Sequence, residues 1–185
     1  MLLALPGVRA QSVADVTQLK VERSDEGVLL SATMAFELPA AVEDALSKGI
    51  AMYFVADAEL SRDRWYWYDK RIAMATRSVR LSFQPLTRRW RVQVSANAPA
   101  SSGPELTLGQ NFESLTEALA SVQRISRWKI AESAEVESLV KHTLEFSFRL
   151  DVSKLPRPFQ IGAVGQNDWN ISAKRTLRLV LEPER

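Results

Sequence analysis

The sequence predicts a mainly β protein: a single-domain, antiparallel β-sandwich of immunoglobulin-like architecture with about eight strands and two short helices. Three observations support this prediction. Apolar residues recur at every second position over most of the chain, two pairs of such segments are joined by short turn-forming links, and only two short segments show helical spacing. Alternation with one polar face is typical of antiparallel sheets that bury the other face.

The N-terminal third predicts a hairpin, a helix and a central strand. Alternation over residues 16–36 is interrupted at Ser24-Asp25-Glu26-Gly27, which favours a hairpin turn. Residues 39–48 change to helical spacing, with Pro39 suited to a first turn and Gly49 to the position after the last residue. Residues 50–60 return to alternation with apolar residues on both faces, which indicates a central strand.

The middle of the chain predicts a further strand over residues 64–75 and a second hairpin over residues 79–94, with its turn at residues 85–88. Residues 96–109 show little periodicity, so we expect a surface loop there. Asn111 is predicted to cap a helix that runs to about Gln123.

Three more strands are predicted toward the C-terminus, over residues 125–130, 144–150 and 176–181. Between the last two, Pro156 and Pro158 fix φ and remove hydrogen-bond donors, so we expect an extended segment anchored by Leu155 and Phe159. Trp169 is expected to plug the end of the core, with Asp168 accepting a backbone hydrogen bond in the preceding turn.

Composition limits the class of protein. The chain has 185 residues, a formal net charge of +2 and no cysteine, which suits one globular domain and excludes disulfides and thiol chemistry. Residues 1–10 resemble the end of a secretory signal peptide whose start is missing because of a misassigned start codon. We therefore expect a domain over residues 11–185 that is periplasmic or otherwise exported, the alternative being a cytoplasmic protein. No segment of the sequence is apolar over the roughly 20 residues that a transmembrane helix needs.

The sequence offers little catalytic chemistry, and we expect neither an enzyme nor a cofactor nor a metal. His142 is the single histidine and lies on the predicted core face of its strand. Two carboxylate pairs, Asp57 with Glu59 and Glu113 with Glu117, are interpreted as solvated residues. A hydrolase using Asp57, Glu59 or His142 remains the alternative, because such chemistry needs convergent groups that spacing alone does not reveal.

The most unusual segment is basic and aromatic. Between Ser61 and Arg91 there are nine basic and two acidic residues, together with Trp65-Tyr66-Trp67-Tyr68 and Trp90. Its candidate binding residues are Arg80, Arg89, Arg91, Trp65 and Trp67. Such a surface suits a protein partner, an anionic lipid or a glycan, whereas export argues against nucleic acid. The competing interpretation is structural, with one tryptophan pair in the core and arginines protecting a sheet.

Four motifs carry a resemblance to a family. Residues 150–160 read LDVSKLPRPFQ and residues 168–172 read DWNIS, alongside Trp65-Tyr66-Trp67 and Arg89-Trp90-Arg91-Val92. Over nearly the whole chain these residues resemble an uncharacterised family of exported proteobacterial proteins, the domain-of-unknown-function family four-three-nine-zero. The resemblance implies a signal peptide and no established activity, cofactor or catalytic residue. It also implies genes that often lie beside a membrane sensor histidine kinase of the nitrogen-regulation type.

The functional expectation combines these observations. We expect a non-catalytic periplasmic accessory module that binds a membrane or periplasmic protein such as the sensor histidine kinase. An anionic lipid-binding or glycan-binding module is the alternative, and a hydrolase is the third. The sequence makes no prediction of the oligomeric state.

Overall fold

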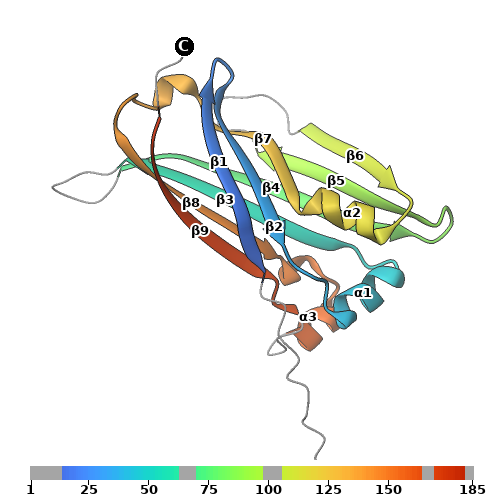
Figure 1. Ribbon diagram of the computed structural model, residues 1–185. Helices are drawn as coiled ribbons and strands as arrows, with labels where there is room; N and C mark the ends of the chain where they lie inside the picture. The colour runs from blue at the N-terminus through green and yellow to red at the C-terminus, as the bar shows by residue number, and fades with distance from the viewer. Residues whose placement is uncertain (1–13, 63–69, 98–105, 164–168, 182–185) are drawn as a thin grey trace, which may run out of the picture.

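The protein is a sandwich of two antiparallel sheets, as the computed structural model shows for residues 14–62, 70–97, 106–163 and 169–181 (Figure 1). The predicted mainly β sandwich class is therefore confirmed. Within the described residues there are nine strands and three α-helices, one more of each than expected. The predicted signal remnant (residues 1–10), Trp65, Trp67 and Asp168 lie outside the described residues.

The smaller sheet has three strands in the order β1-β2-β7: β1 (Asp15–Ser24), β2 (Gly27–Ala35) and β7 (Arg124–Ala131). Strands β1 and β2 form the predicted first hairpin. Gly27 closes its turn with a φ of 127°, a backbone conformation that favours glycine. The pairing of β2 with β7 contains two register shifts, and Arg127, which lies within the second, has a positive φ of 45°.

The larger sheet has six strands in the order β6-β5-β4-β3-β8-β9. Their bounds are β3 (Met52–Arg62), β4 (Lys70–Gln84), β5 (Arg89–Asn97), β6 (Leu106–Phe112), β8 (Lys141–Leu150) and β9 (Ser172–Val180). Strand β3 pairs with both β4 and β8, which confirms the central strand predicted from its apolar residues on both faces. Strands β4 and β5 form the predicted second hairpin.

Helices α1 (Ala40–Ser47) and α3 (Arg157–Ala163) lie at one end of the sandwich, and α2 (Leu115–Val122) lies along the side where β6 and β7 are the edge strands (Figure 1). Helix α1 follows the predicted range, and Gly49 after it has a φ of 84°. Helix α2 lies over the inner face of β5 and leads into β7 (Figure 1). Two short 3-10 helices, η1 (Ser133–Glu135) and η2 (Val152–Lys154), flank β8. Helix α3 was not expected.

Four local predictions were wrong. Residues 106–109 belong to β6 rather than to a loop, and Ser114 instead of Asn111 caps α2, its side chain accepting a hydrogen bond from the Glu117 N–H. The strand expected to end at Ala75 and the strand of the second hairpin are one 15-residue strand, β4.

The fourth wrong prediction concerns the segment with two prolines, which forms α3 instead of an extended chain. Both prolines fit because Pro156 lies at the start of this helix and Pro158 lies in its first turn, where N–H groups have no partner within the helix. The carbonyl of Pro156 accepts the first bonds of the helix, from the N–H groups of Phe159 and Gln160.

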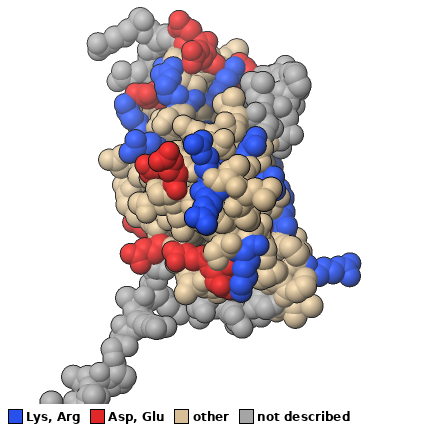
Figure 2. Space-filling view, turned by 90° about the vertical axis from the view of Figure 1, so that its right-hand side faces the viewer, with Lys and Arg blue, Asp and Glu red and all other residues tan. Residues whose placement is uncertain are grey.

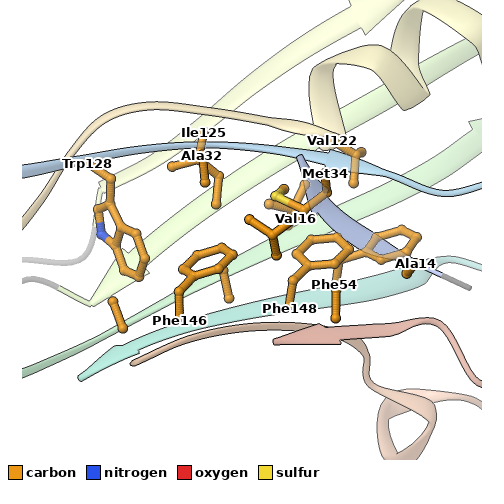
Figure 3. Close-up of a cluster of buried hydrophobic side chains, with 14 of the residues drawn as sticks. Ala14, Val16, Ala32, Met34, Phe54, Val122, Ile125, Trp128, Phe146 and Phe148 are labelled. Carbon is orange, nitrogen blue, oxygen red and sulfur yellow. The ribbon is translucent and has the colours of Figure 1, made fainter. Parts of the chain in front are cut away.

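The core lies between the two sheets and is built by the alternate residues that the sequence places on one face. Phe54, Phe146 and Phe148 point from the larger sheet toward Met34 and Trp128 of the smaller sheet (Figure 3). The rings of Phe54 and Phe148 stack with centroids 5.6 Å apart. Trp169 is buried at one end of this core, with its ring 6.4 Å from that of Phe159, which agrees with the predicted plug.

The two sides of the sandwich differ. On one side β1 and β9 lie next to each other, and the Arg175 guanidinium donates a hydrogen bond to the Val16 carbonyl across the gap (2.6 Å). On the other side the sheets end at β7 and β6, with α2 running between them (Figure 1). Strand β6 therefore forms the free edge of the larger sheet on the open side of the molecule.

Candidate functional site

The candidate arginines lie on the outer face of the β4–β5 hairpin, which faces away from the smaller sheet. Alternation places Val79, Leu81 and Val92 in the core, so the intervening residues Arg80 and Arg91 point outward. Arg89 lies opposite Gln84 at the turn end of the hairpin. The structure thus brings the three predicted arginines to one end of one face. Trp65 and Trp67, predicted with them, fall outside the described residues.

Tyr53 of β3 lies opposite Arg80 in the strand register, on the side of the hairpin next to β3. The guanidinium carbon of Arg80 is 5.9 Å from the centre of the Tyr53 ring, and the ammonium of Lys154 is 5.4 Å from it. Arg80 also donates a hydrogen bond to the Gln93 side chain at 3.1 Å. Cations held over a ring in this way keep their charge exposed while their stems are ordered. We call Arg80, Arg89, Arg91, Lys154 and Tyr53 the basic surface.

Arg91 is placed by a glycine on the neighbouring strand. In the pairing of β5 with β6, Gln93 lies opposite Gly109, and the Arg91 side chain extends over this glycine. A Cβ atom at position 109 would lie 3.3 Å from one terminal nitrogen of Arg91 and 3.6 Å from its Nε. The absence of a side chain at Gly109 therefore lets the Arg91 guanidinium lie on the edge strand of the sheet.

The cations of the basic surface form no ion pair with a described carboxylate, whereas Arg71 and Arg149 on the same face do. Asp57 forms an ion pair with Arg149 and accepts a hydrogen bond from the Thr76 hydroxyl at 2.8 Å, and Glu59 forms an ion pair with Arg71 at 2.7 Å. Within the described ranges, no ion pair involves a cation of the basic surface. Unpaired cations therefore gather at one end of the outer face.

Figure 2 views the molecule from the side that carries the β4–β5 turn in Figure 1. Lys and Arg groups occur at the upper left, in the centre and on the right of this view, and Asp and Glu groups lie among them at the top, at the centre left and across the lower part. Uncharged surface lies between the basic groups, so this side carries local patches of each sign instead of one continuous basic field. Such a pattern suits recognition of a shaped, charged partner more than attraction of any polyanion.

The residues predicted for the hydrolase alternative do not lie close together in the structure. Asp57 and Glu59 project from the outer face of β3, where each is held by an arginine. His142 projects into the core from β8 and is fully buried, opposite Arg62 of β3. The sheet separates the imidazole from both carboxylates. Of the second pair, Glu113 precedes the Ser114 cap and only Glu117 lies in α2, and both are exposed.

The described residues border two shallow hollows on the outer faces. One of about 150 Å³ is bordered by Asp57, Glu59 and Lys174 on the larger sheet, and one of about 250 Å³ by Lys20, Ser31 and Arg124 on the smaller sheet. Both have mixed polar walls and no buried catalytic pair. No group of three or more potential metal ligands occurs among the described residues. None of the helices in the described ranges has the length and apolar character needed to cross a bilayer.

Sequence reasoning missed one residue, Arg77 of β4. It lies on the inner face of the larger sheet, between Ala56 and Ala96 in the strand register, and its Nε is buried without a hydrogen-bond partner. Burial lowers the pKa of Arg77 below its usual value because desolvation disfavours the charged form. The signal was present in the sequence, since Arg77 has the same strand parity as Val79 and Leu81.

Comparison with known proteins identifies a family without a known activity. The family described as a domain of unknown function (DUF4390) matches residues 11–178, in agreement with the resemblance noted from the sequence motifs. No curated protein and no solved structure matched the chain. Because the match covers most of the 185 residues, the chain belongs to the DUF4390 family.

Proposed function

We propose that this protein is an exported, non-catalytic module that binds an acidic site on a protein partner through the basic surface. The observation that carries the proposal is the group of cations without carboxylate partners on the outer face of the β4–β5 hairpin and beside Tyr53, whereas Arg71 and Arg149 on the same face are paired. The partner that the family resemblance suggests is the extracytoplasmic part of a membrane sensor histidine kinase.

Two physical arguments support a protein partner. Arginine and tyrosine are enriched at protein interfaces because they combine a large contact area with hydrogen-bonding ends. The basic surface also lies on a β-sheet, whose pairing holds Arg80, Arg91 and Tyr53 in fixed positions. A rigid arrangement costs less conformational entropy on binding than the same residues would on a loop.

The experiment combines charge reversal with site-specific cross-linking. The double variant Arg89→Glu/Arg91→Glu should lose capture of the partner from detergent-solubilised envelopes. The matched control is Lys174→Glu/Arg178→Glu, which makes the same charge change at exposed positions of β9 in the same sheet. A photo-reactive residue at Gln93, opposite Arg80 on β5, should cross-link one membrane protein, whereas one at Lys20 on the smaller sheet should not.

The results separate the partner classes. Capture should weaken as ionic strength rises, because the attraction is electrostatic. Equal capture by the two double variants would refute the proposal. Flotation of the wild-type protein, but not the Arg89→Glu/Arg91→Glu variant, with phosphatidylglycerol-containing vesicles and without a protein cross-link would replace the protein partner with an anionic lipid surface.

A further inference from the structure

Strand β6 differs from the other sheet edges in lacking the features that usually prevent strand pairing. Exposed edges are commonly protected by charged residues, prolines or bulges. Strand β7 carries Arg124, Arg127 and Lys129 as well as register shifts, and β9 carries Lys174, Arg175 and Arg178. Strand β1 has a register shift near its start and lies against β9.

Strand β6 reads LTLGQNF, with no charged residue and no proline. Its pairing with β5 is continuous from Trp90 opposite Phe112 to Ala96 opposite Leu106, without a register shift. No described residue pairs with its other edge. In an antiparallel sheet every second residue of an edge strand directs its N–H and C=O outward, so β6 offers a regular row of donors and acceptors.

The two faces of β6 define what an added strand would need. On the inner face, Leu108 lies next to Val94 and is 71% exposed, although Val94 packs against the core. On the outer face, the Arg91 guanidinium lies over Gly109. An added strand would therefore meet an apolar side chain on one face and a cation on the other.

From this combination we propose that β6 binds its partner by strand addition, and that the bound segment alternates acidic with apolar residues. Its acidic residues pair with Arg91 on the outer face, and its apolar residues cover Leu108 on the inner face. Backbone hydrogen bonds along β6 supply affinity, and the alternating side chains supply specificity. This inference rests on the proposed function and specifies how the partner engages the basic surface.

The positive charge of Arg91 disfavours pairing of β6 with the β6 strand of a second copy of this chain. If two β6 strands paired about a two-fold axis, the Arg91 cations of both copies would lie at the same strand–strand interface. Like charges opposite each other on neighbouring strands destabilise their pairing. An acidic segment instead neutralises Arg91, the cation that reaches β6.

The first test places photo-reactive residues at two positions of the full-length protein. The probe at Gln110, an exposed residue of β6, should give the same cross-linked partner as the probe at Gln93. A product from Gln93 alone would overturn strand addition and leave the proposed function standing. Products from neither position would overturn the proposed function. A product of two copies of this chain from Gln110 would assign the edge to self-association and overturn the inference.

The second test changes the edge without changing the basic surface. Leu108→Lys adds a cation that an acidic partner should attract, but it removes the apolar contact and adds an edge-protecting charge. We expect it to lower partner capture by about tenfold or more, the loss that corresponds to one buried apolar side chain. Leu86→Lys is the matched control, because Leu86 is fully exposed in the β4–β5 turn. Equal capture by both variants would overturn the inference.

A third measurement needs no natural partner. A synthetic peptide alternating glutamate with valine should slow amide hydrogen exchange at every second residue of β6. A peptide alternating lysine with valine should leave the exchange unchanged. Absence of protection by the acidic peptide at millimolar concentration, or equal protection by both peptides, would contradict strand addition by an acidic segment.

Discussion

Replacing Phe148 by alanine tests the packing on which the whole fold depends. Phe148 is 1% exposed, and its ring lies 5.4 Å from that of Phe36 and 5.6 Å from that of Phe54. Truncating a buried phenylalanine costs about 3–5 kcal/mol, through lost transfer free energy and the cavity left behind. Two ring contacts place Phe148 in the upper part of that range, at about 4 kcal/mol, since each aromatic pair adds about 0.5–1.5 kcal/mol.

The assay is urea unfolding followed by circular dichroism, with a thermal scan as a second measurement. A loss of about 4 kcal/mol corresponds to a decrease in Tm of roughly 8–16 °C for a domain of this size. Glu145→Ala is the control, because Glu145 is an exposed residue of the same strand on the opposite face. Its cost should stay within about 0.5 kcal/mol.

The comparison of the two variants can refute the sandwich packing. If Phe148→Ala costs less than about 2 kcal/mol, the ring is not packed between two sheets as described. If Glu145→Ala costs as much as Phe148→Ala, the alternation of buried and exposed residues along β8 is wrong. Either result would also remove the support for the outer face, because the same alternation places Arg80 and Arg91 outward.

Two more substitutions test particular contacts. Arg77→Met should raise the free energy of unfolding by about 1 kcal/mol, because it replaces a partly buried cation, whose Nε has no hydrogen-bond partner, with an apolar side chain of similar length. Unchanged or lower stability in urea unfolding would show that the cation is solvated. Gly109→Val should keep or raise stability, since valine favours strands, but should lower partner capture by displacing Arg91. Wild-type capture by this variant would show that the partner does not depend on the position of Arg91.

The sequence predicted the elements in which apolar residues alternate without interruption. Leu144, Phe146 and Phe148 identified β8, and the turn residues 24–27 identified the first hairpin. The arginines of the second hairpin were correctly placed on its polar face. These predictions succeeded because burial of one sheet face imposes a two-residue period that local sequence records directly.

The failures have physical reasons. Strand β6 was missed because Gly109, Gln110 and Asn111 interrupt the alternation, and only pairing with β5 makes that segment a strand. The basic surface depends on Lys154 and Tyr53, which are about a hundred residues apart and meet only through the fold. A local sequence pattern cannot predict such a contact. It also cannot predict which arginines form ion pairs with Asp57 and Glu59.

The central position of β3 has a consequence for how the chain assembles. Its neighbour β4 follows it closely, but its other neighbour β8 begins only at Lys141, so one edge of β3 stays open until the last quarter of the chain arrives. Pairings between segments so distant in sequence form slowly. Until they form, an unpaired apolar strand can associate with other chains. The late arrival of β8 therefore leaves an apolar strand edge exposed during folding, and we expect aggregation to compete with folding at this stage.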